Sequence, residues 1–177
     1  MEWKIPALRS IPFLLAGLIA LLPAVLWANG TGRAASPAEH TAVRAVHRWD
    51  AVLAVGLAGA ALAVSGLAYV VGFTGIAGAV GRNTAVYLGI ALLLTPVVGH
   101  RVAAPLTAAY PLVCAGVGGR ADGGAEPWAL VLHRPDSAPA LAAGVAVLAA
   151  GGAFALATPP AAGGVRWLRT VAAQFRL

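Results

Sequence analysis

The feature that most constrains this chain is the arrangement of its apolar residues in long blocks that carry no charge. Of its 177 residues, 60% are hydrophobic and 10% are charged, and the mean hydropathy is +0.84. A soluble domain carries about 25% charged residues, whereas an apolar block of about 20 residues can cross a bilayer as a helix. We therefore expect an all-α, polytopic integral membrane protein with a single domain over residues 1–177.

The apolar blocks predict four membrane spans, at about residues 11–27, 49–73, 84–104 and 140–158. The first block has one alternative, a cleaved signal peptide within residues 1–28. Its apolar run is longer than the usual h-region of about 7–15 residues, and Leu26 fits poorly at the −3 position of a cleavage site. We therefore expect a retained span that ends at Trp27 near a membrane interface, with a turn at Asn29-Gly30.

The third apolar block, residues 84–118, leaves two arrangements open. A helix of that length would extend about 52 Å, against a hydrocarbon core of about 30 Å. Either one long helix runs on to about Ala104, or a span ends at Gly99 and residues 102–117 form a second, broken or re-entrant segment. We expect the first arrangement, because the polar pair His100-Arg101 is too short to join two antiparallel helices.

The positions of the cations predict contacts with lipid and the orientation of the chain in the membrane. The net charge is +6, but the cations lie beside apolar blocks and no nucleic-acid-binding motif accompanies them, so nucleic acid is not an expected partner. Residues 164–177 form an amphipathic pattern that predicts an interfacial helix on anionic lipids. Four spans place both termini on one side, and Lys4 and Arg9 favour the cytoplasm, although Lys and Arg are equally numerous on the two sides.

The second span carries a stripe of small residues, Gly56, Gly59, Ala63 and Gly66. Their spacing places them on one helical face, where another helix can approach closely. We expect this face to pack within the chain, with a dimer interface as the alternative. Pro96 is the corresponding packing residue of the third span, where a proline frees a backbone carbonyl and favours a kink.

Histidines are the candidate cofactor ligands. In the four-span arrangement His47, His100 and His133 all lie at one membrane face, where neutral imidazoles from different helices can ligate a haem or a transition metal. The pairing of histidines on two helices that di-haem cytochromes b require is missing. We therefore expect no cofactor, and keep b-type haem as the alternative.

Arg101 and Asp50 are the candidate functional polar residues of the membrane region. A cation within an apolar block costs about 2.5–3.5 kcal/mol on insertion scales, which favours a functional reason for its presence. Asp50 is the acid nearest to a span and is the expected partner of Arg101. The alternative is an arginine that extends from a helix end to the head groups.

One segment resembles a known family. Residues 87–98, YLGIALLLTPVV, are similar to the middle helix of a small uncharacterised prokaryotic membrane family with three spans, in which a Gly-started run ends in Thr-Pro and an arginine follows three residues later. The resemblance covers about residues 44–158, but Gly99 stands at the arginine position and Arg101 comes two residues later. It implies no known enzymatic activity and an association with exporters of anions or sulfur compounds.

These observations predict a non-enzymatic, multi-pass protein of the plasma membrane. The chain has no HExxH, GxSxG or P-loop motif, and a single cysteine, Cys114, cannot form an internal disulfide. We expect an accessory or structural subunit of a transporter or other membrane complex, whose partners are the bilayer and a larger membrane protein or a second copy. The alternative is a haem-binding or quinone-interacting subunit of a membrane redox complex.

Overall fold

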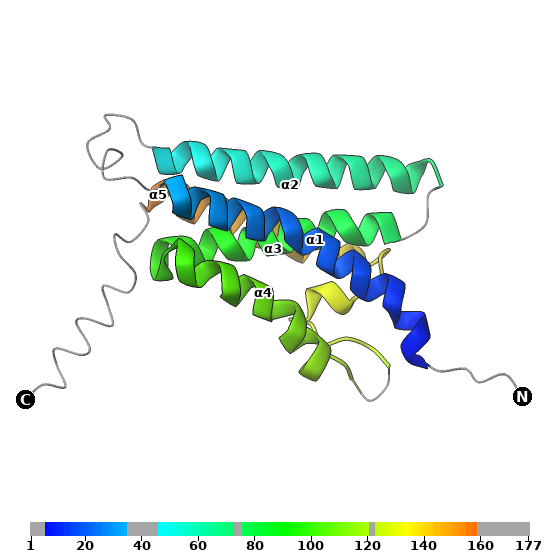
Figure 1. Cartoon of the computed structure of the whole chain (residues 1–177). Coiled ribbons are helices and arrows are strands. Elements are labelled where there is room, and N and C mark those ends of the chain that lie inside the picture. Colours follow the sequence, from blue (N-terminus) through cyan, green and yellow to red (C-terminus); the bar gives the residue numbers. More distant parts are fainter. Residues whose placement is uncertain (1–5, 35–45, 73–75, 121–122, 159–177) are drawn as a thin grey trace, which may run out of the picture.

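The computed structural model describes residues 6–34, 46–72, 76–120 and 123–158, and this part of the chain is helical without a β-strand (Figure 1). It contains one short 3-10 helix, η2 (Leu130–Leu132), and five α-helices, which are α1 (Pro6–Ala34), α2 (Val46–Val70), α3 (Ile76–Val98), α4 (His100–Val117) and α5 (Ala138–Ala157). The predicted all-α class is confirmed.

Three of the described helices are long and apolar enough to cross a membrane, and they cover His47–Val70, Ala77–Val98 and Ala138–Ala157. They correspond to the second, third and fourth predicted spans. A shorter apolar stretch in α1, Gly17–Thr31, overlaps the first predicted span. The count of four spans remains a prediction.

Consecutive helices alternate in direction, and α3 lies at the centre of the bundle in contact with the other four α-helices (Figure 1). One end of the bundle, where α2 and α4 begin and α3 and α5 end, is called the Trp27 end below. The opposite end, where α3 and α5 begin, is called the Arg82 end. The start of α1 lies at the Arg82 end and the end of α5 at the Trp27 end, on opposite sides of the bundle.

Glycines allow α3 to approach its neighbours closely. A Cβ atom added to Gly89 would lie 2.8 Å from the backbone nitrogen of Leu148 in α5, and one added to Gly151 would clash with the carbonyl oxygen of Gly89. On the α2 side, a Cβ atom on Gly81 would clash with Ser65. Backbone contact at this range leaves no room for a side chain, so α3 packs against α2 and α5 through its glycines.

The predicted packing face of α2 is wrong. Ala63 is exposed, and a Cβ atom on Gly56, Gly59 or Gly66 would meet nothing within 4 Å. Helix α2 instead turns a different face inward, whose buried residues are Ala51, Ala54, Ala58 and Ser65. Both faces carry small residues at helical spacing, so the pattern alone does not choose between them.

The predicted continuous helix over 84–104 is also wrong, and the arrangement in which a span ends at Gly99 is the observed one. Gly99 has φ 78° and ψ 162°, a conformation that glycine adopts without steric cost. The chain therefore reverses at one residue instead of through a polar loop. Helix α4 returns along α1 and α3, and Pro96 lies buried in the last turn of α3.

The first helix extends beyond its predicted end. A turn was expected at Asn29-Gly30, but α1 continues to Ala34. Two polar side chains bond back to the carbonyl four residues earlier, with 2.9 Å from Asn29 Nδ2 to Val25 O and from Thr31 Oγ1 to Trp27 O. Residues 1–5 and 159–177 lie outside the described residues, so the shared side of the termini and the amphipathic helix at 164–177 remain predictions.

The contact between α3 and α5 predicts that Gly89→Ala destabilises the fold. The added methyl group forces the two backbones apart, at a cost of about 1–3 kcal/mol, and we expect a lower midpoint of thermal unfolding in detergent. Gly59→Ala is the matched control, because its methyl group meets open space and alanine favours the helix. An equal midpoint for Gly89→Ala and wild type would contradict the close packing.

Candidate functional site

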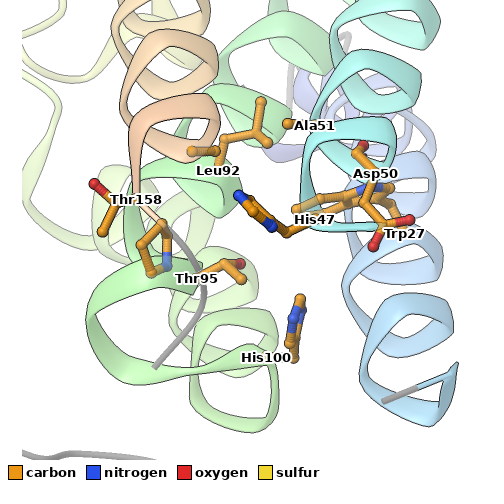
Figure 2. Close-up of a pocket in the computed structure, with 10 residues that line it drawn as sticks. Trp27, His47, Asp50, Ala51, Leu92, Thr95, His100 and Thr158 are labelled. Carbon is orange, nitrogen blue, oxygen red and sulfur yellow. Dashed lines mark hydrogen bonds between the residues drawn. The ribbon is translucent and has the colours of Figure 1, made fainter. Parts of the chain in front are cut away.

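A small cavity at the Trp27 end brings together three of the titratable residues that the sequence singled out, His47, Asp50 and His100 (Figure 2). Its volume is about 20 Å³, and all five α-helices contribute to its wall. The lining residues are Trp27, His47, Asp50, Ala51, Leu92, Thr95, Pro96, His100, Ala155 and Thr158. A cavity of this volume has room for about one water molecule.

Trp27 connects three of the helices around this cavity. Its indole Nε1 donates a hydrogen bond of 3.0 Å to the backbone carbonyl of Asp50 at the start of α2. Its ring also meets the His100 imidazole of α4 edge to face, with centroids 6.3 Å apart. Trp27 was expected at a membrane interface, but only 7% of it is exposed. Its indole is therefore a buried link between α1, α2 and α4.

His100 is held by a second contact with α1. Its Nδ1 atom lies 2.9 Å from Thr31 Oγ1. Thr31 Oγ1 also lies 2.9 Å from the carbonyl oxygen of Trp27, the usual acceptor for the hydroxyl of a helical threonine. We infer that Nδ1–H of His100 donates to Thr31, so that Nε2 is the acceptor in the neutral ring.

Burial lowers the pKa of His100 below its ordinary value of 6.5, and the nearby carboxylate of Asp50 opposes that shift. His100 lies outside the three candidate spans. Figure 2 shows the His47 ring pointing from α2 toward Leu92 and Thr95. Two imidazoles and one carboxylate thus belong to residues that line the cavity.

His133 does not belong to this group, which corrects the predicted set of three histidines. Helix α4 carries the chain back to the Arg82 end before α5 begins, so His133 lies there and its Nε2 is 3.1 Å from the carbonyl oxygen of Glu126. The described residues contain no group of three His, Cys, Asp or Glu that could hold a metal ion.

The haem alternative does not fit the cavity. His47 and His100 both line it, as a pair of axial ligands would, but its volume is about 20 Å³. Sites for small molecules and cofactors occupy about 300–1,000 Å³. A haem between these imidazoles would require the helices to separate.

The predicted pair of Arg101 and Asp50 is not observed. Because α3 ends before Gly99, Arg101 falls in the first turn of α4 at the Trp27 end and is exposed. Within the described part of the chain it forms no ion pair, whereas the backbone of Asp50 accepts the bond from Trp27. The position fits the alternative of an arginine at a helix end.

Arg82 is the polar residue that sequence reasoning missed. It is 1% exposed, and its guanidinium donates to the carbonyl oxygens of Arg134 at 2.8 Å and His133 at 2.9 Å and to Asn83 Oδ1 at 3.3 Å. No carboxylate pairs with it among the described residues. The guanidinium therefore ties the start of α3 to the segment that precedes α5.

Two tyrosines lie in the same half of the bundle. Tyr110 Oη donates to the Trp128 carbonyl at 2.7 Å and accepts from the Leu130 nitrogen at 3.2 Å, which anchors the loop before η2 to α4. Its ring meets Tyr87 edge to face. Tyr87 is fully buried, and its hydroxyl has no hydrogen-bond partner within the described structure.

No protein-family model, curated protein or solved structure matches this chain. The resemblance to a three-span prokaryotic family therefore remains a prediction.

The contacts of Arg82 predict that Arg82→Gln lowers the free energy of unfolding by about 1–3 kcal/mol, because buried carbonyls lose a charged donor. Arg82→Lys should restore only part of the loss, since an ammonium cannot reproduce the planar fork. Thermal unfolding in detergent measures both effects. Arg134→Gln is the control and should change little, because its ion pair is exposed. A wild-type midpoint for Arg82→Gln would show that the buried contacts contribute no stability.

The environment of His100 predicts a stability that decreases in acid. Because the pKa of His100 is lower in the folded chain than in the unfolded chain, its contribution is complete above about pH 6.5 and is lost as the pH falls toward the lowered value. We expect His100→Gln to weaken this pH dependence of the thermal midpoint.

Thr31→Val serves as the comparison for His100→Gln, because it removes the hydroxyl that holds the ring and leaves the imidazole in place. It should lower stability while keeping the dependence on pH. If His100→Gln retains the full wild-type dependence, then His100 does not control it.

Proposed function

We propose that this chain is a small, non-enzymatic, multi-pass protein of the plasma membrane that acts as an accessory or structural subunit of a larger membrane complex. The observation that supports this proposal is the outer surface of α2. Only 22% of its candidate span is buried inside the chain, compared with 67% for α3. Most of α2 is therefore available to lipid or to another protein.

The small residues of α2 make its outer face suited to a protein helix. Gly56, Gly59, Ala63 and Gly66 lie there in the open, so another helix can approach the α2 backbone as closely as α5 approaches α3 at Gly89. Lipid contact alone gives no reason for glycines in a helix, since each costs about 1 kcal/mol of helix stability relative to alanine. Close packing between membrane helices does give such a reason.

A transmembrane helix of a larger membrane protein is the proposed occupant of this face. The chain has no recognisable catalytic motif, and the cavity at the Trp27 end has room for about one water molecule. Both features favour a partner-dependent role over an independent transport or redox activity. A second copy of the chain is the competing occupant, and the native mass of the assembly distinguishes the two.

The proposal predicts that Gly59→Leu separates the chain from its partner. The tagged protein is extracted from native membranes in mild detergent, and the mass and amount of the co-purified complex are measured. We expect a reduction on the order of tenfold, equivalent to about 1.4 kcal/mol. Gly116→Leu is the matched control, because Gly116 is also a helical glycine with nothing within 4 Å. It should leave the complex intact.

Three outcomes would contradict the proposal. A wild-type chain that is monomeric after extraction has no stable partner, and a chain found only as a homodimer makes α2 a self-association face. Flux of a substrate through liposomes that contain the purified chain alone would replace the accessory role with a transport activity.

A further inference from the structure

The exposed arginines differ between the two ends of the bundle. At the Arg82 end, Arg120 pairs with Glu126 at 3.0 Å and Arg134 pairs with Asp136 at 3.3 Å. These two cations are neutralised by carboxylates of their own loops, while Arg82 is buried and donates hydrogen bonds to backbone carbonyls. The surface around these two loops therefore presents little uncompensated positive charge.

At the Trp27 end, the exposed arginines are not neutralised in this way. Arg48 in α2 and Arg101 in α4 are exposed, and neither forms an ion pair or hydrogen bond with the rest of the described chain. Their sequence neighbours His47 and His100 line the same cavity, so both arginines lie at this end of the bundle. Trp49, which is 71% exposed, follows Arg48 directly.

The positions of these residues along the helices place them at the depth of lipid head groups. The candidate spans include His47–Val70 and Ala77–Val98, so Arg48 lies at the first turn of one span and Arg101 just beyond the end of the other. Tryptophan is enriched at this depth of a membrane. A planar guanidinium binds a phosphate through two parallel hydrogen bonds.

We propose that the Trp27 end is a binding site for the phosphate groups of anionic lipids, held by Arg48 and Arg101 with Trp49 beside them at the head-group level. The proposal rests on the membrane placement of the chain and not on its accessory role. This site is also distinct from the lipid contacts that we predict for residues 164–177.

The test measures lipid binding by the purified full-length chain. Retention of phosphatidylglycerol and of phosphatidylcholine is compared by native mass spectrometry after extraction from vesicles that contain both. We expect wild type to prefer phosphatidylglycerol, and the double variant Arg48→Gln/Arg101→Gln to lose that preference by about tenfold. The double variant Arg120→Gln/Arg134→Gln has the same change in charge at the other end and should behave as wild type.

Two further measurements separate the alternatives. Arg48→Lys/Arg101→Lys keeps both charges and should retain most of the preference, and its thermal midpoint reports whether the fold is intact. Inorganic phosphate should not displace the lipid. Equal loss in the two Gln double variants would overturn the proposal in favour of a general charge effect, and displacement by inorganic phosphate would make the site one for free anions. Because the tail is present in every variant, its contribution cancels.

Discussion

The structure depends on the close backbone contact between α3 and α5. Gly89 and Gly151 meet with no side chain between them, and this contact allows α3 to occupy the centre of the bundle with Tyr87, Leu88 and Leu92 fully buried. In a membrane, apolar burial contributes little to helix association, because lipid is as apolar as leucine, and tight packing contributes more. Close backbone packing at the glycines of α3 therefore stabilises the bundle, as a large hydrophobic core stabilises a soluble domain.

Different interactions hold the helices together at the two ends of the bundle. At the Trp27 end, an indole, an imidazole and a threonine hydroxyl join α1, α2 and α4 around a space that fits water. At the Arg82 end, one guanidinium satisfies backbone carbonyls of the segment before α5. Within the described residues, the exposed cations Arg48 and Arg101 of the first end form no ion pair, whereas Arg120 and Arg134 of the second end are paired with carboxylates.

The class of fold could be predicted from the sequence, because uncharged apolar blocks leave few alternatives to membrane helices. The break at Gly99 could be given only as an alternative, because the polar pair His100-Arg101 marks the position but does not show that the chain reverses at one residue of positive φ. Because of this break, α4 carries the chain back to the Arg82 end, and His133 lies at the opposite end of the bundle from His47 and His100. Arg82 was missed for a related reason, because its carbonyl partner on His133 lies 51 residues away. Whether a polar side chain is buried depends on which distant segments of the chain pack against it.

The position of Arg82 has a consequence for the order in which the chain is made. Helix α3 leaves the ribosome before residues 133 and 134, whose carbonyls receive the guanidinium. During that interval an inserted α3 would hold a cation with no protein acceptor from the C-terminal part of the chain, in surroundings that penalise it. The buried contacts of Arg82 can therefore form only after the segment that precedes α5 has been made. Folding of the Arg82 end is in that respect completed by the C-terminal part of the chain.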